Sequence, residues 1–379
     1  MKKYILNIVL VIISSGLALY ANAASTDYTF TNLGTLGGTA SYANAINASG
    51  QIVGYSWTVD RTVHATMWNG TTATDLGALG GDFSVANDIN DAGQVVGYAT
   101  GDFYRTRGVL WDGTTATDLG ANLVDATSIN NAGQIVGVGS VFVAGNGFNT
   151  QDSYHSQAKL LNGASVTNLG TLGGLSSAPA EINNAGQLAG YADIVVGDTR
   201  LSGRRAALWN GTTINNLGSE SINNSSAFAI NDAGQVAGYS VYAGGGARAA
   251  VWDENTTIDL GTLGGNQSVA WGINALGQVV GSANTIYSNV LRATLWNGTS
   301  AIDLNSFLDT NISAEWLLTE AKDINDNGWI VGNATNKISG LSHAFVLTPV
   351  PEPETYSMLV MGFGLVGFVA RRRKVSNFV

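Results

Sequence analysis

The sequence predicts an all-β fold: a seven-bladed β-propeller of four-stranded blades closed by an N-terminal strand, with an N-terminal signal peptide and a short C-terminal transmembrane helix. Three observations support this prediction. A short motif recurs seven times, glycine contributes 49 of 379 residues against 4 prolines, and only 12% of the residues are charged. Such a turn-rich, weakly charged composition suits β-structure and excludes collagen, coiled coils and charge-driven disorder.

Residues 1–23 have the pattern of a secretory signal peptide. Lys2 and Lys3 precede an apolar stretch, and Ala21-Asn22-Ala23 supplies the small residues of a cleavage site. We therefore expect export through the Sec pathway, with residues 24–349 forming the body. The chain has no cysteine, so no disulfide can stabilise the exported body.

The body is an array of seven repeats. Each repeat contains an Ile-Asn pair whose asparagine lies seven residues before a glycine, as Asn47 lies before Gly54. Seven repeats over residues 24–349 give about 47 residues each, which suits a four-stranded propeller blade. The asparagines are Asn47, Asn90, Asn130, Asn183, Asn231, Asn274 and Asn325.

Each repeat is expected to form two hairpins. The first turns just after the Ile-Asn pair, with a glycine at positive φ, and the second turns at Asn-Gly or Asp-Gly. With a two-residue turn at Asn69-Gly70, Trp68 would face Thr71 and His64 would face Asp75. The same register pairs opposite charges in other repeats, namely Arg107 with Asp118, Arg248 with Asp259, and Arg292 with Asp303.

The ring is expected to close between the two ends of the body. The seventh repeat ends with the strand from His343 to Leu347 and lacks a fourth strand, whereas Tyr28 to Gly34 is a spare strand ahead of the first repeat. Pairing these two segments would remove both free sheet edges. Repeats three and five lack the glycine-rich segment after Asp118 and Asn216, so we expect altered edges there.

Loop lengths predict which face binds a ligand. The hairpin turns keep constant spacing, whereas the loops on the other face vary, with 20 residues from Gly137 to Gln157 and 15 from Gly190 to Arg205. Insertions on one side of a repeat protein often mark its binding surface. Aromatic rings beside polar groups would suit a sugar, although the phenylalanines could instead cover a small core of the loop itself. The candidate ligand-binding residues are Phe142, Phe148, Asp152, Tyr154, His155, Asp198, Arg200 and Arg204.

The C-terminal residues 350–379 have three parts: a proline-rich start, an uncharged apolar run from Tyr356 to Ala370, and a basic cluster. As a helix, the apolar run would span roughly 22 Å, which is short of the roughly 30 Å hydrocarbon core unless basic side chains snorkel. We expect a transmembrane helix with its basic tail in the cytoplasm. The proposed signal residues are Val350, Pro351, Glu352, Pro353, Arg371, Arg372, Arg373 and Lys374.

This order of VPEP, apolar span and RRRK resembles the PEP-CTERM sorting signal of Gram-negative bacteria that make exopolysaccharide. The resemblance covers about the last 30 residues. It implies that an exosortase-type membrane protease recognises the Pro351-Glu352-Pro353 segment, and that the protein is anchored transiently in the inner membrane before it reaches the cell surface or the extracellular biofilm matrix. The repeats resemble the bacterial extracellular HAF family, whose His-Ala-Phe appears here as His343-Ala344-Phe345. That resemblance implies export and fold more than activity.

No catalytic centre or cofactor is predicted. Three histidines and no cysteine favour neither a zinc site nor a His-assisted serine triad. Calcium is possible at Asp88 with Asp91 and at Asp323 with Asp326, but no calcium-loop pattern accompanies them. The net charge of -10 argues against nucleic acid as a partner, and the body is more acidic still because both termini carry basic clusters.

The leading interpretation is a noncatalytic protein that binds polysaccharide or another envelope component. Two alternatives stay open. One is a propeller carbohydrate-active enzyme, a glycosidase or lyase with acidic catalytic residues, and the other is a purely structural matrix protein without a discrete ligand. Convergent acidic side chains around the central channel would favour the enzyme, whereas an aromatic platform over repeats three and four would favour binding.

Overall fold

The computed structural model describes residues 27–350, except 102–104, 121, 144–152, 197–200, 219–223, 243–244, 255 and 287. The predicted signal peptide, transmembrane helix and basic tail therefore lie outside the described residues. Within the described part, no helix is long and apolar enough to cross a membrane. One compact unit comprises Thr29–Thr348, and a second comprises Met1–Tyr28 with Pro349–Val379.

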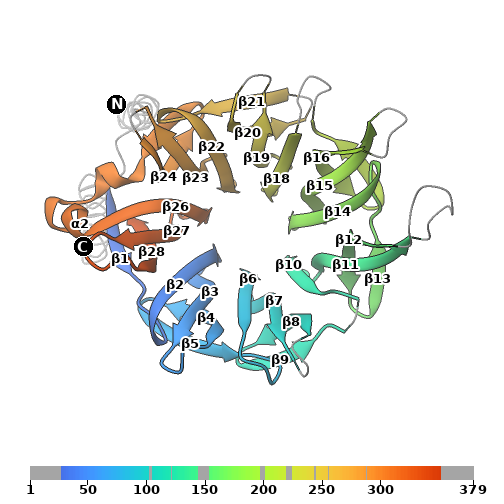
Figure 1. Cartoon of the computed structure of the whole chain (residues 1–379), viewed down its shortest axis with the longest axis horizontal. Helices are drawn as coiled ribbons and strands as arrows, with labels where there is room; N and C mark the ends of the chain where they lie inside the picture. The colour runs from blue at the N-terminus through green and yellow to red at the C-terminus, as the bar shows by residue number, and fades with distance from the viewer. Residues whose placement is uncertain are drawn as a thin grey trace, which may run out of the picture. The chain divides into compact units, whose positions relative to one another are not determined.

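Seven four-stranded antiparallel sheets surround a central channel in chain order, which confirms the predicted all-β propeller (Figure 1). We number the blades 1 to 7 from β2. The first strands line the channel and are β2 (Gly37–Ile46), β6 (Ser84–Ile89), β10 (Asp125–Ile129), β14 (Gly173–Ile182), β18 (Asn224–Ile230), β22 (Gly264–Ile273) and β26 (Trp316–Ile324). The second strands are β3 (Gln51–Thr58), β7 (Gln94–Thr100), β11 (Ile135–Val143), β15 (Gln187–Val196), β19 (Val236–Val241), β23 (Val279–Thr285) and β27 (Ile330–Asn336).

The outer half of each blade holds the third and fourth strands. The third strands are β4 (Val63–Asn69), β8 (Thr106–Asp112), β12 (Ser153–Asn162), β16 (Leu201–Asn210), β20 (Ala247–Asp253), β24 (Ser288–Asn297) and β28 (Ser342–Pro349). The fourth strands are β5 (Thr72–Gly77), β9 (Thr115–Asp118), β13 (Ser165–Asn168), β17 (Thr213–Asn216), β21 (Thr256–Gly261), β25 (Ser300–Asp303) and β1 (Tyr28–Asn32). A 3-10 turn, η2 (Leu304–Phe307), and a short helix, α2 (Thr310–Glu315), connect blades 6 and 7.

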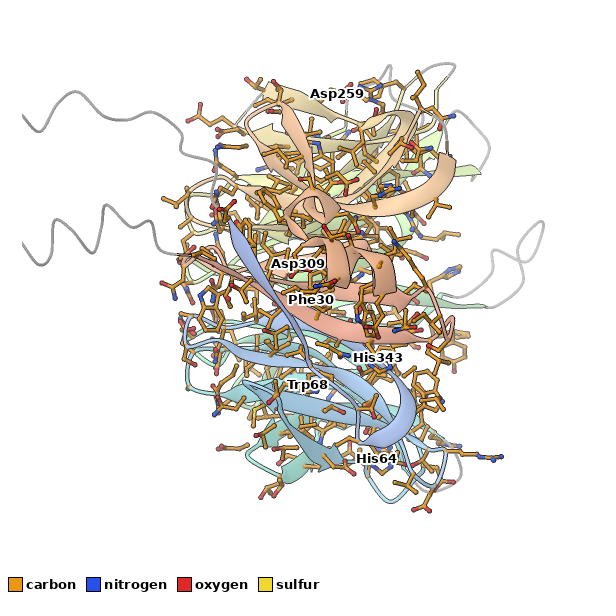
Figure 2. The ribbon with its side chains drawn as sticks, turned by 90° about the vertical axis from the view of Figure 1, so that its left-hand side faces the viewer. Phe30, His64, Trp68, Asp259, Asp309 and His343 are labelled. Carbon is orange, nitrogen blue, oxygen red and sulfur yellow. The ribbon has the colours of Figure 1, made fainter. Side chains whose placement is uncertain are left out.

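The ring closes as predicted. Strand β1 pairs with β28 and completes blade 7, and Leu33 N–H donates to the carbonyl oxygen of Ala344 at 3.0 Å. Figure 2 places β1, marked by Phe30, along blade 7, marked by His343. The Phe30 ring lies 6.1 Å from that of Phe345. Closure leaves no blade without its fourth strand, so the sheet edges exposed by an open array are absent from this part of the chain.

The packing between blades relies on a tryptophan that the third strand carries in five of the seven blades. In five blades this tryptophan is buried against the neighbouring blade, so the blades share cores rather than each having its own. Shared cores fit a repeat array in which each unit is stable only beside its neighbours. The buried residues are Trp68, Trp111, Trp209, Trp252 and Trp296.

The asparagines of the seven Ile-Asn pairs form a closed ring of hydrogen bonds. The side-chain amide nitrogen of Asn47 donates to the carbonyl oxygen of Asn90 in blade 2, and the pattern continues around the propeller until Asn325 donates to Asn47. All seven distances lie between 3.0 and 3.3 Å. Each asparagine is buried, so these bonds fix the spacing of adjacent blades in a place that excludes water.

The glycine seven residues after each ring asparagine permits a β-bulge. In blade 1, Ala43 pairs with Gly54 and Ala45 pairs with Val53, so Asn44 is an extra residue in the first strand. A Cβ on Gly54 would collide with the carbonyl oxygen of Tyr42, and the same collision recurs in all seven blades. The invariant spacing is thus explained by the bulge, which turns one residue per blade toward the channel.

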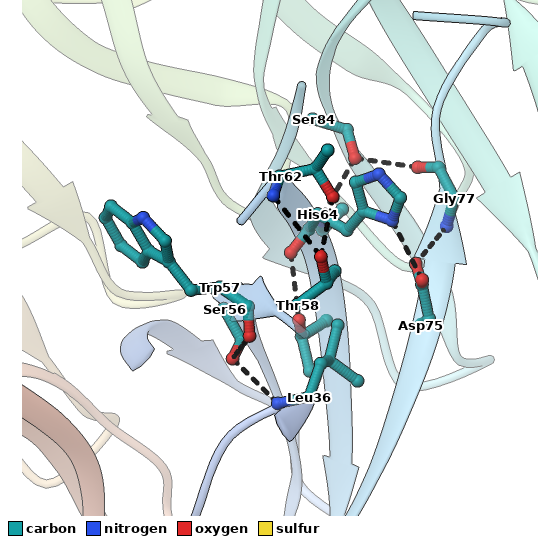
Figure 3. A network of polar contacts seen from close by, with 11 residues as sticks. Leu36, Ser56, Trp57, Thr58, Thr62, His64, Asp75, Gly77 and Ser84 are labelled. Atoms are coloured by element: carbon teal, nitrogen blue, oxygen red, sulfur yellow. Dashed lines mark hydrogen bonds and ion pairs between the residues drawn. The ribbon is translucent and has the colours of Figure 1, made fainter. Parts of the chain in front are cut away.

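The predicted contacts between the third and fourth strands form, but the predicted register is wrong by two residues. Asn69 pairs with Thr72, so Trp68 faces Ala73, and His64 reaches Asp75 diagonally with 2.8 Å between Nδ1 and Oδ2 (Figure 3). The turn needs Gly70 at its first central position, with φ of 59°. A two-residue shift keeps every side chain on its face, so the ion pairs survive. They join Arg107 to Asp118, Arg248 to Asp259, and Arg292 to Asp303.

Candidate functional site

The channel has three successive cavities. The face that carries the turns after the ring asparagines, here the Asn-turn face, opens into a cavity of about 180 Å³. The waist holds about 100 Å³. The opposite face carries the loops between second and third strands and between blades, and we call it the loop face. Its cavity is the largest at about 390 Å³, and we refer to it as the loop-face mouth.

The bulged residues divide the channel lining into two sides. Asn44, Asn87 and Thr127 from blades 1 to 3 form a polar arc. Ala180, Phe228 and Trp271 from blades 4 to 6 form an apolar arc. Lys322 of blade 7 lies between the two arcs. The same backbone feature in every blade therefore presents a different side chain to the channel, so the lining has no rotational symmetry.

The polar arc keeps hydrogen-bond acceptors available. The amide nitrogen of Asn44 donates to the carbonyl oxygen of Ala86 at 2.8 Å, and that of Asn87 donates to Asp125 Oδ1 at 2.7 Å. Among the described residues, nothing donates to the side-chain oxygen of Asn44 or Asn87. Burial raises the pKa of Asp125 to about 6, although the bond from Asn87 opposes this. A hydroxyl-bearing ligand could donate to these amide oxygens.

The apolar arc is built from one stack across three blades. The ring centroids of Phe228 and Trp271 lie 4.4 Å apart, and the Lys322 ammonium lies 4.0 Å from the centre of the Trp271 ring. Lys322 also approaches Glu320 at 3.4 Å. The Trp271 ring is therefore contacted from both neighbouring blades, and it offers the cavity an apolar wall rather than two free faces.

Half of the predicted ligand-binding residues can be placed. Phe142 lies opposite Tyr154 where β11 and β12 extend beyond the usual hairpin, and their ring centroids are 5.4 Å apart. Their exposures of 52% and 74% show that both rings are largely open to solvent while they contact each other. The other predicted residues Phe148, Asp152, Asp198 and Arg200 lie outside the described residues.

His155 and Arg204 meet around Asp193. Partial burial raises the pKa of Asp193, while the charges of Arg204 and His155 act in the opposite direction. The Arg204 guanidinium also lies 3.6 Å from the centre of the Tyr191 ring, and Tyr191 lines the loop-face mouth. The described ends of the extended hairpins of blades 3 and 4 thus lie near each other, and the contact of Arg204 with Tyr191 connects blade 4 to the loop-face mouth.

Three carboxyl groups at the waist were not predicted as a group. Asp88, Glu181 and Asp323 each lie two residues before a ring asparagine. Burial raises all three pKa values, that of Asp323 to about 6 and that of Glu181 well above its ordinary range. Repulsion from Asp323 and Asp88 adds to the shift of Glu181.

These carboxyl groups connect neighbouring blades. Asp88 Oδ2 accepts from the Ser128 hydroxyl at 2.6 Å, Asp323 Oδ2 from Ile46 N–H at 2.9 Å, and Glu181 Oε2 from Ile230 N–H at 2.8 Å. Both oxygens of Asp88 thus accept hydrogen bonds from protein donors. In the described ranges no group of three or more His, Asp or Glu side chains could hold a metal ion.

Comparison with known proteins identifies the C-terminal segment. Residues 349–374 match the PEP-CTERM protein-sorting motif, and nothing matches among the curated proteins. Of the predicted signal residues, only Val350 lies within the described part of the chain, where its N–H donates to the backbone carbonyl oxygen of Asp27 at 2.8 Å. Pro351 and the signal residues after it lie outside the described residues. The chain is therefore a seven-bladed propeller with a signal that marks exported proteins of Gram-negative bacteria. The signal is of the PEP-CTERM type, which implies recognition by an exosortase membrane protein.

Solved structures with a similar fold have low sequence identity to this chain. TolB from Acinetobacter baumannii has a TM-score of 0.44 and 12% identity, with 84% of this chain and 65% of that chain covered. SapL1 lectin in complex with alpha methyl fucoside has a TM-score of 0.35 and 16% identity, covering 85% and 99%. Trypanosoma rangeli sialidase has a TM-score of 0.37 and 10% identity, covering 86% and 60%. The chain thus spans less than two thirds of TolB and of the sialidase, and these likenesses concern the fold alone.

Proposed function

We propose that this protein is sorted by an exosortase-type protease to the cell surface or extracellular matrix, where it binds polysaccharide without catalysis. The binding site is the loop-face mouth. One observation carries the proposal: Asn44 and Asn87, whose side-chain oxygens accept no hydrogen bond from the described residues, line the same cavity of about 390 Å³ as the apolar arc. Small-molecule pockets of roughly 300–1,000 Å³ commonly combine apolar walls with a few polar groups, and a sugar offers both hydroxyls and apolar ring faces to such walls.

The repeats themselves argue that these side chains are free to serve a ligand. Blades 1 to 7 share the same bulge, yet the bulged residue ranges from alanine to tryptophan. The blade therefore does not require any particular side chain at this position. We therefore attribute the asparagines of the polar arc and Trp271 of the apolar arc to contacts with a ligand in the channel rather than to packing of the blades.

A glycan array probed with the purified protein tests the binding function. Asn87→Thr and Trp271→Thr place in blades 2 and 6 the residue that blade 3 already tolerates at Thr127, so both variants are expected to fold. Losing one hydrogen bond should weaken binding by roughly 2- to 10-fold. Trp329→Gln is the matched control, because it removes an aromatic side chain from the opposite face and restores the residue of the other six repeats. If no glycan on the array binds, the proposal is contradicted and a purely structural matrix role is favoured. Mouth variants that bind glycan as well as the wild type would also contradict the proposal.

The insertions of blades 3 and 4 extend the proposed site. Shortening the interval from Gly137 to Gln157 to the usual 10 residues should leave the blade folded, because surface loops tolerate changes in length. Glycan binding should fall, since His155 and Asp193 stand beside Tyr191 at the mouth. Unchanged affinity in a folded, shortened protein would restrict the site to the channel.

A second candidate function is a carbohydrate-active enzyme with Glu181 as the acid. Its support is that Glu181 Oε1 accepts no hydrogen bond from the described residues, while its pKa lies well above the ordinary range. Against it, the waist cavity of about 100 Å³ is well below the roughly 300–1,000 Å³ of common small-molecule pockets. If the protein cleaves the glycan that it binds, and if Glu181→Gln abolishes cleavage but not binding, the protein is an enzyme and the noncatalytic function is refuted.

The sorting half of the proposal has its own test. Changing residues 351–353 to alanine should leave the full-length protein in the membrane fraction, because the exosortase would no longer recognise it. Wild-type protein should appear at a smaller size outside the inner membrane. Release of the variant at the normal size would mean that residues 349–374 do not act as a sorting signal here.

A further inference from the structure

Among the described residues, blade 1 is the one blade that carries three aromatic rings in mutual contact. Tyr42 of β2 and Tyr55 of β3 stack with centroids 5.0 Å apart and an interplanar angle of 17°. The Trp57 ring lies 6.0 Å from each of them. All three side chains are partly exposed. We call Tyr42, Tyr55 and Trp57 the blade-1 cluster.

The fold does not require these rings. Tyr42 and Tyr55 are a cross-strand pair, and the same pair is Val269 with Ser282 in blade 6 and Glu320 with Asn333 in blade 7. Thr100 and Thr335 occupy the position of Trp57 in two other blades. A tyrosine at the position of Tyr55 recurs in three other blades, as Tyr98, Tyr191 and Tyr239. Tyr42 and Trp57, by contrast, have no aromatic counterpart at their positions in the other six repeats, so the shared blade structure does not explain these two rings.

The cluster adjoins the polar arc of the loop-face mouth. Tyr42 lies two residues before Asn44 on the same strand. Burial raises the pKa of Tyr55 to about 12, with further contributions from Tyr42, Tyr98 and Glu320, so its hydroxyl lies near groups of blades 2 and 7 as well as its own.

The cluster also keeps polar and apolar surface available. Within the part of the chain that the structure describes, the hydroxyls of Tyr42 and Tyr55 make no hydrogen bond, so both can donate to or accept from a ligand. Figure 3 shows the Trp57 ring pointing away from the polar network around Ser56 and Thr58. Trp57 is partly exposed, so the part of its ring that Tyr42 and Tyr55 leave uncovered is available to a ligand.

We infer that the blade-1 cluster is a second sugar subsite, on which a pyranose ring stacks after the glycan passes the polar arc at Asn44. This inference rests on the proposed function and narrows its ligand to an extended polysaccharide chain rather than a single terminal sugar. The mouth holds one part of the chain through hydrogen bonds, and Trp57 holds a later unit through its ring face, with the tyrosine hydroxyls as nearby donors.

The dependence of affinity on chain length tests the subsite. The probes are short (disaccharide and trisaccharide) and long (hexasaccharide and above) fragments cut from the extracellular polysaccharide of the producing cells, and calorimetry on the purified full protein measures the affinity. Trp57→Thr and Tyr55→Ser copy residues that other blades carry, so the variants should fold, and their urea midpoints verify this. Trp57→Thr should lower affinity for long fragments about tenfold and leave short fragments unchanged.

Two further variants separate the subsite from the mouth. Trp271→Thr should weaken both fragment classes, because both enter the mouth, whereas Trp329→Gln on the opposite face should weaken neither. Equal affinity of wild type for short and long fragments, or a Trp57→Thr variant that binds long fragments normally, overturns the subsite while the mouth stands. If the unaltered protein binds neither class, the proposed function fails and the subsite fails with it.

Discussion

Replacing one asparagine of the closed ring should destabilise the whole propeller. Asn183 is 4% exposed, and its amide nitrogen donates to the carbonyl oxygen of Asn231 at 3.1 Å and to Gln187 at 3.0 Å. Its side-chain oxygen accepts from Gln187 N–H at 2.8 Å. Asn183→Ala removes all three bonds: the Gln187 N–H loses its partner, and the Asn231 carbonyl oxygen keeps only the bond from Gly234 N–H. At about 1–3 kcal/mol for each unsatisfied buried group, the free energy of unfolding should fall by about 3 kcal/mol.

The neighbouring residue provides a matched control. Asn184 is exposed, and its amide donates to Asp232 at 3.0 Å, where water can replace the lost partner. Asn184→Ala should therefore cost less than about 1 kcal/mol. Urea unfolding of both variants, followed by tryptophan fluorescence and by circular dichroism, measures the difference. If Asn183→Ala is no more destabilising than Asn184→Ala, the ring of hydrogen bonds does not stabilise the propeller.

Three other predictions follow from the fold. Gly238→Ala should cost several kcal/mol, because its Cβ would meet the carbonyl oxygen of the facing bulge, whereas Gly101→Ala should be nearly neutral since its closest neighbour would be 3.5 Å away; equal melting temperatures would contradict the bulge explanation. The pKa of Asp323 is about 6 in the folded protein against an ordinary 3.8, so the unfolded chain ionises first as pH rises. The free energy of unfolding should thus fall by up to about 3 kcal/mol between about pH 4 and pH 7, and Asp323→Asn should flatten this dependence; an unchanged slope would refute the assignment. Deleting Tyr28 to Gly34 should open the ring and lower the melting temperature, and a truncated body that melts like the intact one would show that closure is not stabilising.

The architecture could be predicted because the same sequence pattern occurs seven times in the chain. The constant spacing from Asn47 to Gly54 set the number of blades, and the missing strand after Leu347 identified Tyr28 to Gly34 as its replacement. The ion pair of His64 with Asp75 was also predictable, although from a register that is wrong by two residues. The correct contacts emerged because a two-residue shift preserves the face of every side chain.

The channel lining could not be predicted from periodicity. An alternating strand without a bulge gives no reason for Asn44, Phe228 and Trp271 to approach one another, and the glycine that permits the bulge lies on the next strand. The group of carboxyl residues at the waist could not be predicted for a related reason. Glu181 and Asp323 belong to blades that are far apart in sequence, and they approach each other only because the ring closes. The signal was nevertheless present, as the variable residue three positions before each invariant asparagine.

Because the blades form a closed ring, the propeller can close only after the last strand of the chain has been synthesised. Asn325 of the final repeat donates to Asn47 of the first, and β28 receives β1, so the earliest and latest segments to be synthesised depend on each other. The sorting motif at residues 349–374 begins where β28 ends. A polypeptide that terminates before β28 therefore lacks both the partner of β1 and the sorting motif, so a chain that carries the motif also carries every strand needed to close the ring.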